Sequence, residues 1–446
     1  MEETATGHVL FGLDPLWVST GLLVVTYATI MTEKLNRAIV ALLGAGLMIS
    51  LGLLNQEQAV EGIDFNTLAL LTGMMLIVAI ARRSGIFQYV AIVSAKAARA
   101  NPAGIVFMLA LVTALVSALL DNVTTVLLIA PVTLVICREL KVKPYPFLFA
   151  EIMAGNIGGT ATLIGDPPNI IIGSAAGLTF LDFVYALTPI IAIILLVNCL
   201  AIHLIWGRSM SATSEAKARV MALDHRDAIT DRPLMIKSVG VIALVIVAFV
   251  LARMLHLEAG TIALFGAAIL LLLDNLGRSV EDQHHRLIES FNEVEWITIF
   301  FFVGLFIVVA GVEHAGLLKM MADWLVRVTQ GDMWLMGVSI LWVSAILSAI
   351  IDNIPFVATM IPVIKNMAPT FGGEAALLPL WWALSLGACL GGNGTLIGAS
   401  ANLTVAGIGE RAGVPFRFLE FAKIAFPLML LSIVISHLYL AWRYLP

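Results

Sequence analysis

Two aspartates stand inside apolar runs of this chain, and an asparagine follows each of them. Asp121-Asn122 lies within SALLDNVTT, and Asp352-Asn353 lies within SAIIDNIPF, 231 residues further on. A carboxylate at the centre of a bilayer costs roughly 2.5–3.5 kcal/mol on insertion scales. A position that is costly and yet duplicated indicates a use. Buried carboxylates can load and release protons or hold a metal cation.

Two further acids lie in comparable surroundings. Asp166 lies in the glycine-rich stretch GGTATLIGDPPN, and Glu151 lies in the apolar arm that leads to this stretch. The corresponding stretch of the second half is GGNGTLIGASAN, which contains no acidic residue. We predict that Asp121, Asp166, Asp352 and Glu151 couple transport to a proton or cation, with helix capping as the alternative role of the aspartates. No Lys or Arg falls at any of these breaks, which argues against a permanent site for a dianion.

Polar side chains gather at the same four breaks and are the candidate ligands of a solute. Helix capping, or satisfying backbone groups freed by the breaks, is their alternative role. The candidates are Asn122, Thr124, Asn156, Thr160, Thr162, Asn169, Asn353, Asn393, Thr395 and Asn402.

The amino-acid composition indicates the class of protein in which these residues lie. Hydrophobic residues make up 60% of the 446 positions and charged residues only 12%, whereas soluble domains carry about a quarter charged residues. Runs of roughly 18 or more apolar residues recur and predict a polytopic helical membrane protein. The cysteines, Cys137, Cys199 and Cys389, form no CxxC pair and read as small buried hydrophobes, and no metal-ligand cluster stands out.

Matching glycines, aspartates and prolines divide the chain into two repeats, 1–206 and 236–446, joined by a polar linker at 207–235. Each repeat is expected to hold five transmembrane helices and a re-entrant hairpin. The fold class is therefore all-α, with about ten transmembrane helices in two repeats of inverted topology. The hairpins are placed at 103–137 and 333–368, and the broken helices at 146–176 and 377–408. Binding sites of such proteins lie near the midplane, where broken helices meet.

Positive charge predicts the orientation. If both termini lie outside, 20 of the 25 Lys and Arg residues fall on the side of the linker, including Lys34 and Arg37. The positive-inside rule then places the linker in the cytoplasm and both termini in the periplasm. The expected location is the inner (plasma) membrane, crossed many times.

The glycine-rich stretch 158–169, the DNVTT motif at 121–125 and the stretch TEKLNRAIVALLGA at 32–45 resemble the ArsB/P-protein permease group of the ion transporter superfamily. The resemblance covers nearly the whole chain. That group includes arsenite and antimonite efflux permeases, sodium/proton antiporters and a melanosomal anion permease. The resemblance implies scaffold regions flanking mobile transport regions and a possible homodimer, as in the dicarboxylate branch. Arsenite permeases of this group act either alone or with a soluble ATPase partner. The chain itself has no phosphate-binding loop, so any ATP hydrolysis must come from that partner.

These observations favour a secondary transporter over an enzyme, because no nucleophile–base pair is evident. The first hypothesis is proton-coupled efflux of arsenite or antimonite, small inorganic solutes that are essentially uncharged at neutral pH. The alternatives are a sodium/proton antiporter and a sodium-coupled anion or dicarboxylate transporter. No cofactor is expected besides H⁺ or Na⁺ as the coupling ion, and no nucleic-acid partner.

Overall fold

The computed structural model describes residues 12–32, 34–207 and 210–445, and every regular element within these ranges is helical. The first half contains α1 (Pro15–Met31), α2 (Arg37–Ser50), α3 (Gln56–Glu61), α4 (Phe65–Arg82), α5 (Ile86–Ala97), α6 (Pro102–Ser117), α7 (Asn122–Leu140), α8 (Tyr145–Gly159), α9 (Pro167–Ala176) and α10 (Phe180–Trp206). Helix α11 (Ser214–Ala222) lies in the polar linker.

The second half repeats this order. It contains α12 (Arg232–Leu255), α13 (Ala259–Asn275), α14 (Val280–Asn292), α15 (Trp296–His314), α16 (Leu317–Val328), α17 (Met333–Ile350), α18 (Asn353–Asn366), α19 (Ala368–Phe371), η3 (Glu374–Leu377), α20 (Leu378–Gly391), η4 (Gly392–Gly394), α21 (Ser400–Arg411) and α22 (Phe418–Arg443). The all-helical architecture predicted from the sequence is confirmed.

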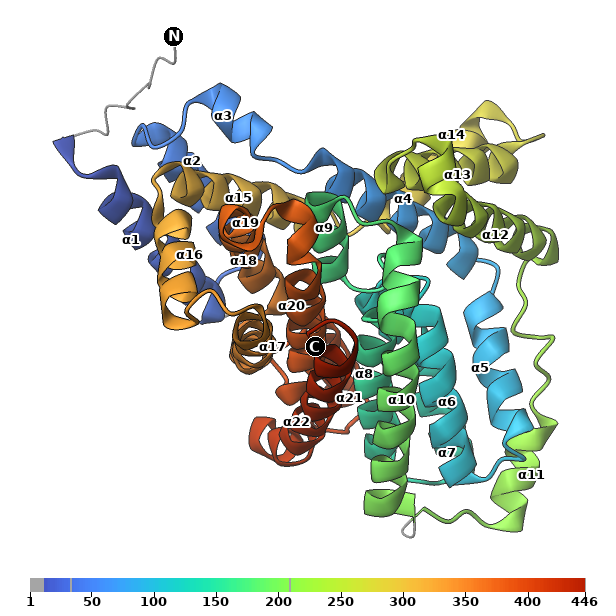
Figure 1. The fold of residues 1–446 in the computed structure, drawn as a ribbon. Coiled ribbons are helices and arrows are strands. Elements are labelled where there is room, and N and C mark those ends of the chain that lie inside the picture. The colour runs from blue at the N-terminus through green and yellow to red at the C-terminus, as the bar shows by residue number, and fades with distance from the viewer. Residues whose placement is uncertain (1–11, 33, 208–209, 446) are drawn as a thin grey trace.

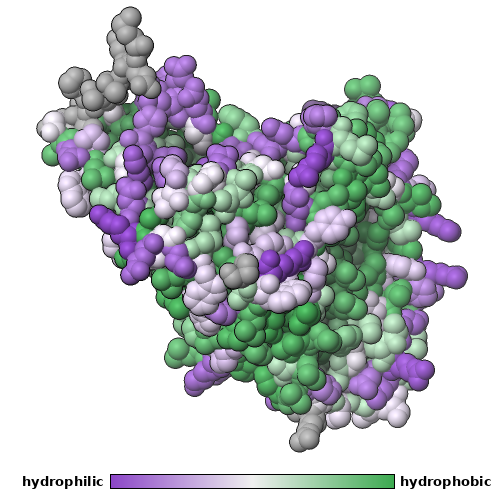
Figure 2. All heavy atoms as spheres, viewed as in Figure 1, coloured by the Kyte–Doolittle hydropathy of each residue, from purple (hydrophilic) through white to green (hydrophobic). Residues whose placement is uncertain are grey.

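The helices suit a lipid environment. Eight helical segments in the described ranges are long and apolar enough to cross a membrane. Large apolar side chains remain exposed on several of them, as Leu204 on α10 and Trp442 on α22 do. Figure 2 shows a broad hydrophobic surface on this face of the molecule, with hydrophilic residues mostly toward its margins. The protein is therefore a multi-pass membrane protein.

The two halves are interlocked. Helix α4 packs along α13, and α2 packs along α15. Figure 1 shows the result: α2 lies beside α15, whereas α4 lies beside α12 and α13. Glycines allow both contacts, since a Cβ at Gly73 would lie 2.5 Å from the backbone of Ala263, and a Cβ at Gly304 would lie 2.6 Å from that of Ala41. The two equivalent contacts define a scaffold built from both repeats.

The hairpins and broken helices form a second region against this scaffold. Within each repeat the first arm of the hairpin packs on the first part of the broken helix, α6 on α8 and α17 on α20. The second arms cross between repeats, because α7 packs on α21 and α18 on α9. This arrangement brings all four breaks to one place. We call the helices α6 to α9 and α17 to α21 the core region.

The linker marks one side of the scaffold. The backbone N–H of Thr230 donates to the carbonyl of Ser84, 3.1 Å away, just after α4 ends. Asp274, nearly fully buried at the end of α13, pairs there with Arg83 at 2.6 Å and Arg286 at 3.0 Å. We call this the linker side. Helix α10 runs from the opposite side to the linker.

Candidate functional site

The two aspartates of the hairpins occupy equivalent positions, each at the N-cap of a second arm. Asp121 accepts a hydrogen bond from the N–H of Thr124 at 2.8 Å, and Asp352 accepts one from the N–H of Ile354 at 3.1 Å. Both therefore satisfy free amides at a helix start, as the capping alternative predicts. Their caps leave further carboxylate lone pairs for other partners.

The glycine-rich breaks are held by matching hydrogen bonds in the two repeats. The side-chain amide of Asn169 donates to the carbonyls of Thr160 and Thr162, at 3.1 and 2.9 Å. That of Asn402 donates to the carbonyls of Gly392 and Thr395, at 2.7 and 2.8 Å. These amide groups are used to shape the loops.

Hydroxyl groups connect each break to the hairpin of its own repeat. Thr162 donates to the carbonyl of Ala118, and Thr395 donates to that of Ala349. The hydroxyl of Thr160 instead donates to the carbonyl of Asn156, one turn earlier in α8, at 2.7 Å. Of the four predicted threonines, Thr162 and Thr395 therefore hold carbonyls at the ends of α6 and α17. The carbonyl that Thr160 contacts keeps its helical bond, because it also accepts from the backbone N–H of Thr160 at 3.1 Å.

Asparagines join the two repeats at the centre of the core region. The amide of Asn122 donates to the carbonyl oxygen of Asn156 at 3.0 Å. The amide of Asn156 then donates to Asn393 at 2.9 Å and to Asn402 at 2.8 Å. All four are buried. Predicted ligands more than 230 residues apart thus form one connected network.

Asp166 is the least satisfied polar group at the breaks. It is 1% exposed, and neither carboxylate oxygen has a hydrogen-bond partner among the described residues. It stands at the N-cap of α9, but its side chain makes no capping bond. The amide of Asn353, 3% exposed, also lacks a hydrogen-bond acceptor for its Nδ2. A buried carboxylate in this condition is suited to take up a proton or a cation.

Asp352 has a basic partner, although no Lys or Arg falls at the breaks in the sequence. Nη1 of Arg37, at the start of α2, lies 3.0 Å from its Oδ2. Arg37 also donates to Ser400 at 2.6 Å and to Thr298 at 3.3 Å, and its guanidinium lies 5.0 Å from the ring centre of Phe301. Arg37 and Asp352 are 315 residues apart in the sequence, so only tertiary packing brings them together. The place of Arg37 in the first turn of α2, within a stretch that the resemblance singles out, was the available signal.

A small cavity opens at the hairpin tips. Its volume is about 20 Å³, and its wall includes Asp121, Asn122, Asp166, Asn353 and Ser400. The scaffold contributes Arg37, Glu295 and Thr298 to the same wall.

A second cavity, of about 50 Å³, shares Met75 and Glu295 with the first. It is also lined by Thr124 and by Arg82 and Glu293, which lie at the end of α4 and before α15 on the linker side. The tips are thus approached from the linker side. Glu295, which the sequence analysis did not single out, accepts a hydrogen bond from Thr298 at 3.0 Å between the two cavities.

Glu151 lies apart from this cavity. It is fully buried in α8, five residues before Asn156, or roughly 7.5 Å along the helix. The hydroxyl of Thr133 donates to its Oε1, and its Oε2 has no hydrogen-bond partner among the described residues. Of the cysteines, Cys389 reaches the site, where its thiol donates to Oδ1 of Asn169 at 3.5 Å.

Two interlocked repeats with broken helices, and polar groups and acids meeting where the helices break, are typical of secondary transporters. The comparisons agree. The sequence profile of the citrate transporter family, CitMHS, matches residues 27–387, and the chain belongs to this family.

Curated relatives match over almost the full chain. An uncharacterised transporter of Mycobacterium bovis is 43% identical over 431 residues, covering 96% of this chain and 98% of its own. The 46 kDa membrane protein of Mycobacterium leprae is 42% identical, with coverages of 95% and 97%. The mouse P protein is 35% identical, covering 94% of this chain and 60% of its own. The P-protein part of the predicted resemblance is confirmed.

Solved structures share the fold at low identity. The YdaH transporter of Alcanivorax borkumensis superposes with a TM-score of 0.60 at 14% identity, covering 97% of this chain and 99% of its own. MtrF of Neisseria gonorrhoeae gives 0.57 at 11% identity, with coverages of 97% and 96%.

Proposed function

We propose that this transporter exports arsenite or antimonite in exchange for protons, by exposing the hairpin-tip site alternately to the two sides of the membrane. The observation that carries the proton-coupled part is Asp166, a buried carboxylate whose two oxygens have no hydrogen-bond partner among the described residues. A group in this condition gains most from binding a proton or a cation.

The balance of charge around the cavity supports a positive coupling ion. Asp121, Asp166 and Glu295 line it, and Arg37 is the one basic residue in its wall. The guanidinium of Arg37 is committed to Asp352. No positive charge is therefore left for a multivalent anion in this arrangement.

The polarity of the site supports a small uncharged solute. In this arrangement the cavity of about 20 Å³ has room for about one water molecule, so the site must widen during transport to admit As(OH)₃. As(OH)₃ offers three hydroxyls, each a donor and an acceptor. Asn122 and Asn353, with the free Nδ2 of the latter, are suited to bind such hydroxyls.

A second candidate is the cation-coupled uptake of a carboxylate. It is favoured by the presence of Arg37 and by four helix N-termini, those of α7, α9, α18 and α21, which begin beside the cavity at Asn122, Pro167, Asn353 and Ser400. The description of the family, citrate transporter, points the same way. Sodium/proton antiport would use the same acids without a solute.

One assay separates these functions. Everted vesicles that contain the protein are given a proton gradient, acidic inside, without ATP. Arsenite and sodium are supplied outside in turn, whereas citrate is loaded inside, because uptake into a cell corresponds to release from an everted vesicle. Arsenite should accumulate, and vesicles with Asp166→Asn should lose this gradient-driven uptake. Gradient-driven release of citrate, or uptake of sodium, without any accumulation of arsenite would reject the arsenite proposal. Gradient-driven accumulation by the Asp166→Asn variant equal to that of the unmodified protein would reject the role of Asp166.

The topology is part of the proposal. We propose that the linker is cytoplasmic, that both termini are periplasmic, and that the protein works as a homodimer in the inner membrane. A soluble ATPase would be an optional partner, because the proposed export is driven by the proton gradient and requires no ATP. A reporter that fluoresces only in the cytoplasm, fused after Pro446, tests the orientation. A periplasmic C-terminus should give no fluorescence.

A further inference from the structure

The two ends of the scaffold that face the core region are equivalent by the repeat but make different contacts. The matched contacts of Gly304 with Ala41 and of Gly73 with Ala263 fix the correspondence between α2 and α13. By this register the first residue of α2, Arg37, corresponds to the first residue of α13, Ala259. One scaffold end therefore carries a cation where the other carries a methyl group.

The scaffold ends also meet different parts of the broken helices. Arg37 reaches Ser400, the first residue of α21. At the other end, Asn66 of α4 donates to Ser174 at 3.0 Å, and Ser174 lies seven residues after Pro167, the first residue of α9. Seven residues of helix span roughly 10 Å. Relative to a symmetric placement, the core region is thus shifted along the scaffold toward the linker side.

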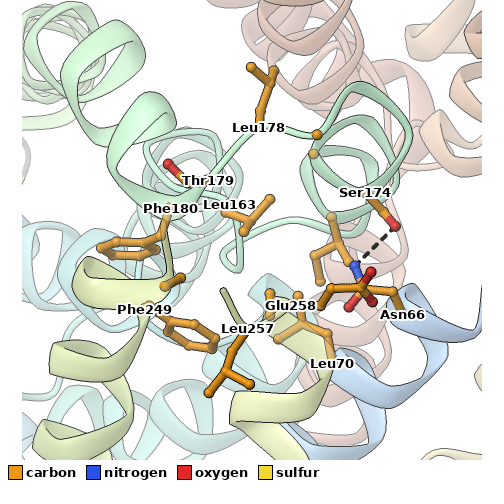
Figure 3. Close-up of a pocket in the computed structure, with 15 residues that line it drawn as sticks. Asn66, Leu70, Leu163, Ser174, Leu178, Thr179, Phe180, Phe249, Leu257 and Glu258 are labelled. Carbon is orange, nitrogen blue, oxygen red and sulfur yellow. Dashed lines mark hydrogen bonds between the residues drawn. The ribbon is translucent and has the colours of Figure 1, made fainter. Parts of the chain in front are cut away.

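A cavity occupies the space that this shift leaves. Its volume is about 200 Å³, and it borders the start of α13 on the side opposite the linker. Figure 3 shows Asn66, Leu257 and Glu258 on its scaffold wall, and Ser174, Leu178 and Thr179 on the wall formed by α9 and the loop that follows it. Inverted repeats can exchange their conformations to expose a midplane site to the other side. That exchange would close this cavity and place Ala259 beside Asp121, while withdrawing Arg37 from Asp352.

We propose that Arg37 is a state-dependent counter-ion, which neutralises Asp352 when the site faces the linker side and leaves it when the site faces the opposite side. The inference deepens the proposed function and rests on its alternating access. With the site toward the linker, Arg37 competes with the coupling cation for Asp352 and favours its release there. With the site toward the opposite face, no guanidinium replaces Arg37, because Ala259 is apolar and its neighbour in the chain is Glu258. Asp352 is then free to bind the next cation.

The same ion pair holds the shifted arrangement in place. It joins the scaffold to the core region directly, with a Nη1–Oδ2 distance of 3.0 Å and side chains that are 25% and 16% exposed. Two further bonds, to Ser400 and Thr298, fix the guanidinium. Removal of Arg37 should therefore favour the exchanged arrangement, in which the cavity next to Leu178 is closed.

A cysteine at Leu178 reports on that cavity. The reporter is Leu178→Cys, labelled with a maleimide in purified protein in nanodiscs, where both faces are accessible and no substrate is needed. The rate should fall about fivefold or more when Arg37→Ala is added, within the range typical of coupling between sites. Arg37→Lys keeps the charge and should stay within about twofold of the reporter alone. Protein without Leu178→Cys gives the background, because Cys137 and Cys389 are fully buried and Cys199 is half-buried.

Moving the charge is the decisive comparison. In Arg37→Ala combined with Ala259→Arg, the cation stands at the other scaffold end, and labelling should be at least as slow as with Arg37→Ala alone. An unchanged rate in Arg37→Ala, or a return to the reporter's original rate in the combined variant, would overturn the proposal. Misfolding would speed labelling, so a fall in rate cannot come from it. Because the readout needs no solute, it is independent of whether arsenite is transported.

Discussion

Asn156 provides the sharpest test of how the two repeats are joined. It is the one side chain in the buried asparagine network that contacts three others, accepting from Asn122 and donating to Asn393 and Asn402. The variant Asn156→Ala removes all three hydrogen bonds. Each side-chain hydrogen bond between membrane helices contributes about 0.6 kcal/mol on average and up to about 2 kcal/mol. The expected loss in free energy of unfolding is therefore about 2 to 5 kcal/mol.

A matched control comes from Asn198 in α10. It is also buried, and its amide donates across the repeats to a single side chain, Ser432 of α22, at 3.0 Å. Asn198→Ala should thus cost about 0.6 to 2 kcal/mol by the same rule. Reversible unfolding in mixed micelles, followed by tryptophan fluorescence, measures both variants. If Asn156→Ala costs no more than Asn198→Ala, the network does not hold the repeats together, and Asn156 is better explained as a solute ligand alone.

Three further outcomes are expected. Asp166→Asn should fold like the unmodified protein on size-exclusion chromatography but lose proton-gradient dependence in vesicles, because no hydrogen bond among the described residues is lost with the carboxylate. Gly73→Ala should lower the free energy of unfolding by about 1–3 kcal/mol, because its Cβ would lie 2.5 Å from the backbone of Ala263; an unchanged midpoint of unfolding would contradict this close contact. Glu151→Gln should keep its bond from Thr133, since an amide oxygen also accepts, while the number of protons moved per solute falls; an unchanged ratio would leave Glu151 a structural role.

Much of the fold followed from the sequence because its signals are local. Apolar length predicts membrane helices, and glycine-rich stretches predict breaks, whatever the rest of the chain does. The helices α7 and α18 begin at Asn122 and Asn353, directly after the two aspartates that had been singled out. Four of the six candidate asparagines, Asn122, Asn156, Asn393 and Asn402, also meet at one centre.

Other features of the site could not be foreseen from local signals. Arg37 was counted only as a positive charge on the linker side, yet it pairs with Asp352. No pattern in the sequence indicates Glu295, although it lines both cavities. Asn169, a candidate ligand, directs its amide to the loop carbonyls of its own break. Each of these depends on which surfaces of distant helices pack together.

The sequence by itself therefore determined the membrane class, the duplication and the positions of the costly polar groups. These properties depend on transfer free energies and helix-capping preferences, which act over a few residues. Only the tertiary structure decided the partner of each polar group and the shift of the core region toward the linker side. The repeats give the two ends of the scaffold the same backbone framework, but one rigid arrangement cannot place the core region against both ends in the same way. The two ends differ in this arrangement, because Arg37 at one end pairs with the core region, whereas Ala259 at the other end borders a cavity.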